Sequence, residues 1–120
     1  MAKPDNSIVA QKSFAFALRI VKAYKYLTEH NEYVLSKQLL RSGTSIGANC
    51  REAKNAQSRL DFINKLNIAL KEADETSYWL ELLYAGDYID EQSYTSIYED
   101  CVELIKLLTS IIKTTKDTTN

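Results

Sequence analysis

Four long segments of the chain repeat apolar residues at spacings of three and four, and no segment shows the alternation typical of a β-strand. This spacing places the apolar residues of each segment on one side of an α-helix. The helices are expected at about residues 7–29, 34–56, 58–85 and 90–114. Because helices joined by short loops pack as antiparallel neighbours, the pattern predicts one all-α domain over residues 1–120, an antiparallel up-down-up-down four-helix bundle.

One apolar stripe on each helix is expected to face the core. On the first two helices it comprises Val9, Ser13, Phe16, Ile20, Ala23 and Leu27, then Leu35, Leu39, Ser42, Ile46, Cys50 and Ala53. On the last two it comprises Phe62, Leu66, Ala69, Ala73, Thr76, Leu80 and Leu83, then Tyr94, Tyr98, Cys101, Ile105, Leu108 and Ile112. Asp5, Asn6 or Ser7 is the expected first N-cap, Gly86 is expected to end the third helix, and residues 115–120 are expected to fray.

Small residues crowd the middle of the second segment, QLLRSGTSIGANCREA at residues 38–53. A glycine inside a helix costs about 0.5–1 kcal/mol relative to alanine, so Gly43 and Gly47 require a compensating contact. Without a Cβ at these two positions, a neighbouring backbone or a bulky side chain can lie directly against the helix. We therefore predict that Gly43 and Gly47 are sites of close helix packing.

This segment, together with DFINKLNIALKEADETSYWLELL at residues 61–83, resembles the bacterial four-helix-bundle family of ribosomal-RNA intervening-sequence proteins. The family is related to the accessory variability proteins of diversity-generating retroelements. The resemblance covers residues 13 to 112 approximately. It implies a four-helix bundle assembled into a homopentameric ring, and the retroelement relatives imply association with nucleic acid, although they are strongly basic and this chain has a net charge of −1.

Other features of the sequence bear on where in the cell the protein is located. The first seven residues are polar, which argues against a secretory signal, and no apolar run approaches the ~18 residues of a membrane span. We therefore expect a cytoplasmic protein that does not enter a membrane. Cys50 and Cys101 fall on the apolar sides of their helices, which favours unpaired core thiols over a disulfide or a redox role.

The chain lacks the residues that catalytic or metal-binding helical bundles need. Di-iron bundles use Glu-x-x-His motifs, but the single histidine, His30, lies in an expected loop. No phosphate-binding loop and no Cys–His pairing is apparent, because both cysteines are expected to face the core. We expect no catalytic residues, no metal, no cofactor and no enzymatic activity.

Two helices carry more apolar residues than one core stripe needs. These are Ile68, Trp79 and Leu82 on the third helix, and Ile97, Leu104 and Ile111 on the fourth. Large exposed apolar patches usually mark interfaces, so these residues are predicted to form an oligomer interface. The alternative is a wide monomeric core. The spacing predicts only self-association, and the number five comes from the family resemblance.

Charge is distributed unevenly along the chain. Residues 1–65 hold 11 Lys/Arg and 5 Asp/Glu, whereas residues 66–120 hold 4 and 11. This distribution indicates either a basic binding surface or two halves that pack with complementary charge. The candidate nucleic-acid-binding residues form a stripe on each of the first two helices: Lys12, Arg19, Lys22 and Tyr26, then Lys37, Arg41 and Arg51.

If these two helices are neighbours, their stripes could merge into one basic surface that binds RNA or DNA. That is the leading hypothesis from the sequence. The alternative is a protein–protein scaffold that binds no nucleic acid, in which the basic residues serve only solubility.

Overall fold

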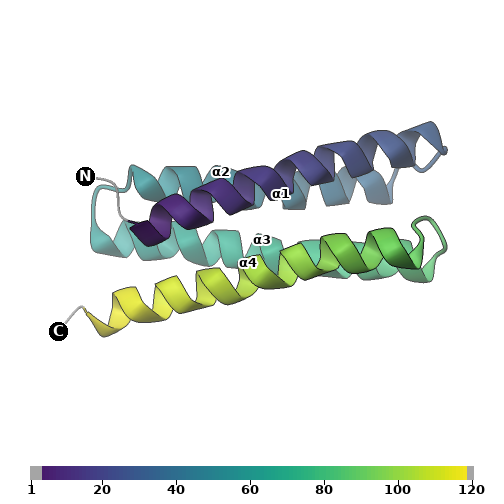
Figure 1. Ribbon diagram of the computed structural model, residues 1–120. Helices are drawn as coiled ribbons and strands as arrows, with labels where there is room; N and C mark the ends of the chain where they lie inside the picture. The colour runs from purple at the N-terminus through teal and green to yellow at the C-terminus, as the bar shows by residue number, and fades with distance from the viewer. Residues whose placement is uncertain (1–3, 119–120) are drawn as a thin grey trace.

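Four α-helices make up the computed structural model, which describes residues 4–118: α1 (Pro4–Glu29), α2 (Leu35–Lys54), α3 (Arg59–Ala85) and α4 (Glu91–Asp117). Within these residues the fold is all-helical with no strand, as the apolar spacing predicts. The α1–α2 and α3–α4 connections lie at one end of an elongated bundle and the α2–α3 connection lies at the other (Figure 1). The bundle measures 50 × 20 × 19 Å.

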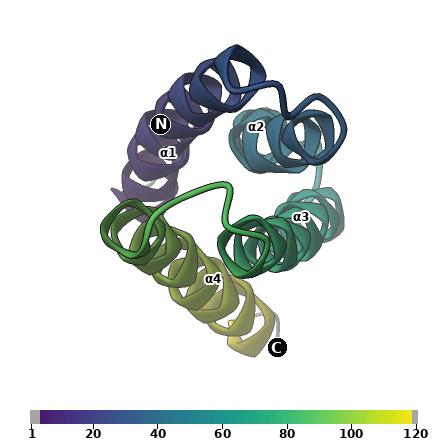
Figure 2. The same ribbon diagram turned by 90° about the vertical axis from the view of Figure 1, so that its right-hand side faces the viewer.

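When the bundle is viewed along its length, the helices are arranged in a ring around the long axis (Figure 2). Each helix contacts the two beside it, and within residues 4–118 the diagonal pairs α1–α3 and α2–α4 make no close backbone approach. The α2–α3 interface is the most extensive and the α1–α4 interface is the least. None of the four helices combines the length and the apolarity needed to cross a bilayer.

Two helix ends lie three residues outside the expected bounds, and the other ends differ by at most two residues. Helix α1 begins at Pro4, so residues 5–7 lie inside the helix and the prediction that one of them is the N-cap is wrong. Helix α4 continues to Asp117, three residues past the expected end, and residues 119–120 of the tail that is expected to fray lie outside the described residues. Ser58 and Asp90 cap α3 and α4 by accepting hydrogen bonds from the backbone N–H groups of Asp61 and Ser93.

Helix α2 is capped from an unexpected position, Glu32 in the preceding connection. Its carboxylate accepts hydrogen bonds from three backbone N–H groups, those of Val34 at 3.2 Å, Leu35 at 3.0 Å and Ser36 at 2.6 Å. Burial alone would raise the pKa of Glu32, but these hydrogen bonds outweigh it and lower the pKa below its ordinary value. The buried carboxylate of Glu32 therefore satisfies N–H groups at the start of α2 that have no partner within the helix.

The core follows the predicted stripes closely on α1, α2 and α3, where only Ala23 and Leu35 of the expected residues are half-buried. On α4 the buried stripe is instead offset from the expected one. It comprises Ile97, Cys101, Leu104, Leu108, Ile111 and Ile112.

The two tyrosines predicted to enter the core lie between α3 and α4 and are half-buried. The ring of Tyr94 stacks on Tyr84 with a centroid separation of 4.4 Å, and the hydroxyl of Tyr98 donates to Glu81 at 2.9 Å. That hydrogen bond, with burial, raises the pKa of Tyr98 to about 12. A tyrosine hydroxyl needs a polar partner, which explains why these residues occupy the edge of the core.

Candidate interaction surfaces

The two glycines of α2 face α1. A Cβ built on Gly43 would lie 2.7 Å from Cγ1 of Ile20, and one on Gly47 would lie 3.3 Å from the backbone oxygen of Ser13. Ile20 is completely buried, so its side chain fills the space beside the glycine. The absence of these two Cβ atoms is what lets α1 approach α2 so closely.

Two of the candidate nucleic-acid-binding residues on α1 reach across to α4. Lys12 forms an ion pair with Glu103 at 3.1 Å, and Arg19 forms one with Asp100 at 2.7 Å. Arg19 also donates to the backbone oxygen and the hydroxyl of Ser96, at 3.3 and 3.0 Å. The guanidinium of Arg19 is therefore already satisfied by groups of its own subunit.

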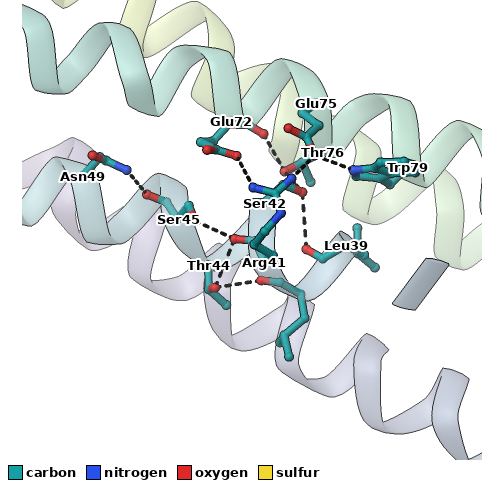
Figure 3. Close-up of polar contacts among 11 residues, drawn as sticks. Leu39, Arg41, Ser42, Thr44, Ser45, Asn49, Glu72, Glu75, Thr76 and Trp79 are labelled. Atoms are coloured by element: carbon teal, nitrogen blue, oxygen red, sulfur yellow. Dashed lines mark hydrogen bonds and ion pairs between the residues drawn. The ribbon is translucent and has the colours of Figure 1, made fainter. Parts of the chain in front are cut away.

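On α2, Arg41 turns to the opposite side of the bundle and contacts α3 (Figure 3). It pairs with Glu72 at 3.2 Å and with Glu75, which also accepts a hydrogen bond from the indole N–H of Trp79 at 2.9 Å. Beneath this ion pair, the buried hydroxyls of Ser42 and Thr76 lie 2.9 Å apart. Polar contacts thus join the middle of α2 to the middle of α3.

Members of the two basic stripes therefore turn to different sides of the bundle, although α1 and α2 are neighbours. Lys12 and Arg19 pair with acidic residues of α4, and Arg41 pairs with acidic residues of α3. Four of the five ion pairs seen among the described residues join a cation from residues 1–65 to an anion from residues 66–120. The charge asymmetry of the chain therefore contributes to packing between its two halves.

The other candidates on the basic stripes remain exposed. Lys22, Lys37 and Arg51 have no ion-pair partner among the side chains that the structure describes. The ring of Tyr26 stacks on His30 at a centroid separation of 4.1 Å. Lys37 and Arg51 flank the exposed Ala48 on the outer side of α2.

Of the two additional apolar stripes, the one on α3 is partly exposed and the one on α4 is buried. On α3, Ile68 and Leu82 are 41% and 36% exposed, and Trp79 is half-buried against the core. On α4, Ile97, Leu104 and Ile111 are at most 7% exposed. The interpretation of these three as a second, exposed stripe is wrong, because they are the core-facing residues of α4 and the tyrosines take the edge.

Sequence reasoning missed an exposed apolar pair on α1. Phe14 and Leu18 are 57% and 49% exposed and lie one turn apart on the side away from Phe16 and Ile20. Their spacing of four opposite the core stripe was the available signal. On α3, Tyr78 is also 54% exposed and lies one turn before Leu82.

Both thiols lie in the core as free cysteines. Burial raises the pKa of Cys50, and burial together with the nearby Asp74 and Asp100 raises the pKa of Cys101 to about 12. Such thiols are poor nucleophiles at neutral pH. Among the described residues, no group of three or more His, Cys, Asp or Glu side chains is arranged to hold a metal ion.

Comparison with known families decides the relationship. The family model of the 23S rRNA-intervening sequence protein matches residues 5–110. The chain belongs to this family. A solved member, a protein of unknown function from the S23 ribosomal protein family of Bacteroides thetaiotaomicron VPI-5482, is 63% identical and superposes with a TM-score of 0.89. The match covers 91% of this chain and 98% of that one. The comparison with curated proteins finds no significant match.

Proposed function

We propose that this family member is a non-enzymatic, self-associating protein scaffold. The observation that carries the proposal is the apolar outer side of α3, where Ile68, Tyr78 and Leu82 are all more than a third exposed. A partner surface that covers these side chains would stabilise the complex by about 25 cal/mol per Å² of apolar area removed from water. A second copy of the chain is the first partner to test, and the family resemblance implies a ring of five subunits.

The ion pairs support a scaffold over a phosphate-binding protein. Phosphate groups would have to displace Glu103, Asp100, Glu72 or Glu75 before reaching Lys12, Arg19 or Arg41. The raised pKa of the buried Cys101 thiol supports the absence of cysteine chemistry. On this proposal the surface cations hold the bundle together and keep it soluble.

The test is the mass of the protein by size-exclusion chromatography with light scattering. The wild type is expected to exceed the subunit mass of 13.7 kDa, and Leu82→Glu and Ile68→Glu are expected to run as folded monomers. Gln11→Glu is the control, because Gln11 is an exposed polar residue on α1 and lies outside the proposed interface on α3. A monomeric wild type, or an oligomer that survives both substitutions, would contradict the proposal.

Trp79→Glu is a poor test of the same interface. Trp79 packs against the core and donates its indole N–H to Glu75, so a charge at this position would destabilise the subunit as well as any contact between subunits. Leu82 is exposed and makes no polar contact that the substitution would break.

Nucleic-acid binding is the second candidate function, and it is supported by the exposed, unpaired cations of α2. Lys37 and Arg51 are fourteen residues apart on its outer side, which corresponds to about 21 Å along the helix axis. Fluorescence anisotropy with structured RNA and duplex DNA across a salt series tests this function. Affinity that falls with salt and is lost in Lys37→Glu/Arg51→Glu would establish it, since phosphate contacts are salt-dependent. No binding at low salt would exclude it.

A further inference from the structure

The end of the bundle that carries the α1–α2 and α3–α4 connections contains a depression of about 330 Å³. We call it the α1–α4 depression, because α1 and α4 form its two walls beside the α3–α4 connection. All four helices contribute to its lining. Its volume lies at the lower end of the range of small-molecule sites, about 300–1,000 Å³.

The floor of the depression is apolar. It is formed by core side chains that carry almost no exposed area of their own: Leu27, Leu39, Leu80, Leu83 and Ile97. Ile89 of the α3–α4 connection covers one side, and Ala23 of α1 leaves room that a larger side chain would fill. An apolar molecule in the depression would therefore contact the half-buried Ala23 and Ile89 and not these buried core side chains.

The rim of the depression is polar and positively charged. It carries Arg19 and Lys22 from α1 and Ser93 from the first turn of α4. Arg19 is neutralised by Asp100 at 2.7 Å. Lys22 forms no ion pair with any side chain that the structure describes, so its ammonium is available to a ligand, whereas Ser93 already donates its backbone N–H to the carboxylate of Asp90 at 2.7 Å.

The position of the depression follows from the packing. The α1–α4 interface is the least extensive of the four. The ion pairs that Lys12 and Arg19 form with α4 lie farther from this end of the bundle than Ala23 and Leu27 do. The α1–α4 interface contains a smaller depression of about 210 Å³ beside these ion pairs, and beyond Arg19 it opens into the larger one. Lys22 is therefore exposed close to the half-buried apolar side chains of Ala23 and Ile89.

We propose that the α1–α4 depression binds a small organic carboxylate with an apolar body, such as a medium-chain fatty acid. The carboxylate pairs with Lys22, while the apolar body lies against Ala23 and Ile89. A charge-assisted hydrogen bond at the rim fixes the orientation, and the apolar area that is covered supplies affinity. This inference is independent of self-association through α3.

The test uses decanoate, below its micelle concentration, as the probe. Titration into ¹⁵N-labelled protein is expected to give saturable one-to-one binding, with amide shifts that centre on Ala23, Ile89 and Ser93. Lys22→Gln should weaken the affinity about tenfold, the usual loss for one charge-assisted contact. Lys25→Gln is the matched control, because Lys25 is an exposed lysine one turn away that does not line the depression.

Two further variants distinguish a loss of binding from a loss of folding. Ala23→Phe should fill the depression and abolish binding, with its thermal unfolding checked in parallel. Lys22→Glu, an exposed position that tolerates either charge, should reverse the preference so that decylammonium binds more tightly than decanoate. The proposal is overturned if the wild type binds both probes equally or not at all, if Lys22→Glu leaves the preference unchanged, or if the shifts centre on Phe14 and Leu18 or on Ile68 and Leu82.

Discussion

Ile20 of α1 occupies the space that a side chain at Gly43 of α2 would need. All three outer carbons of Ile20 lie within 3.0 Å of the position of a Cβ at residue 43. Ile20 is β-branched and completely buried, so it has no alternative rotamer to adopt without disturbing the core. This contact sets the distance between the first two helices.

Gly43→Ala should therefore destabilise the protein by about 1–3 kcal/mol, although alanine is the better helix former. Chemical denaturation measures the change. Gly47→Ala is the milder comparison, because its Cβ would lie 3.3 Å from the nearest atom. Shortening the neighbour in the double variant Gly43→Ala/Ile20→Val should recover part of the loss, and a Gly43→Ala variant more stable than the wild type would show that the helices can separate freely.

Glu32 should contribute to stability in a pH-dependent way. Its pKa is lowered in the folded state, so its contribution is complete above the ordinary pKa of 4.5 and is lost as the pH falls through the lowered value. Glu32→Gln should cost about 1–2 kcal/mol at pH 7, since a helix cap and a favourable charge at the start of α2 are both weakened.

The difference in unfolding free energy between wild type and Glu32→Gln should shrink below pH 4.5. Denaturation curves between pH 7 and pH 2.5 measure this difference. The control is Glu29→Gln, because Glu29 is exposed at the end of α1 and should show neither effect. A constant difference across the pH range would mean that the carboxylate charge plays no part in the cap.

The buried hydroxyls of Ser42 and Thr76 should be energetically coupled. Removing one hydroxyl leaves the other buried with one hydrogen-bond partner fewer, whereas removing both leaves no buried hydroxyl without that partner. Ser42→Ala and Thr76→Val should each cost about 1 kcal/mol, and the double variant should cost less than their sum. A double-mutant cycle measured by denaturation tests this, and strict additivity would show that the two hydroxyls do not interact.

The two thiols should resist modification in the folded protein. With a pKa of about 12, Cys101 is thiolate in on the order of one molecule in ten thousand at pH 8. Ellman's reagent should therefore react slowly with native protein and rapidly with both thiols in guanidinium. Fast reaction of either thiol under native conditions would show that the core opens on the time scale of the assay.

The number and type of secondary-structure elements were predictable because the apolar spacing is long and regular. The close packing at Gly43 and Gly47 was also foreseeable, since a glycine in a helix needs a compensating contact. What the spacing could not decide was which side of α4 faces the core. Two heptad-like series, one starting at Tyr94 and one at Ile97, overlap at Cys101, Leu108 and Ile112. Only the hydrogen-bonding needs of the tyrosines separate them.

The candidate basic surface was less predictable, for a different reason. Lys12, Arg19 and Arg41 lie near the boundary between the outer side of a helix and its neighbour, and their long side chains can point either way. Acidic residues on α3 and α4 decide the direction, and those residues lie 31 to 91 positions away in the sequence. Periodicity within one helix carries no information about such partners.

The ring arrangement of the helices has a consequence for the order of folding. Three of the four interfaces join helices that follow each other along the chain, so each can form by closing a short loop. The α1–α4 interface instead brings together residues as distant as Lys12 and Glu103, and it is also the least extensive. Closing such a long loop costs entropy before the contacts between its ends can contribute, so this interface is expected to form last. The backbone amide hydrogens of α1 and α4 are expected to exchange before those of α2 and α3.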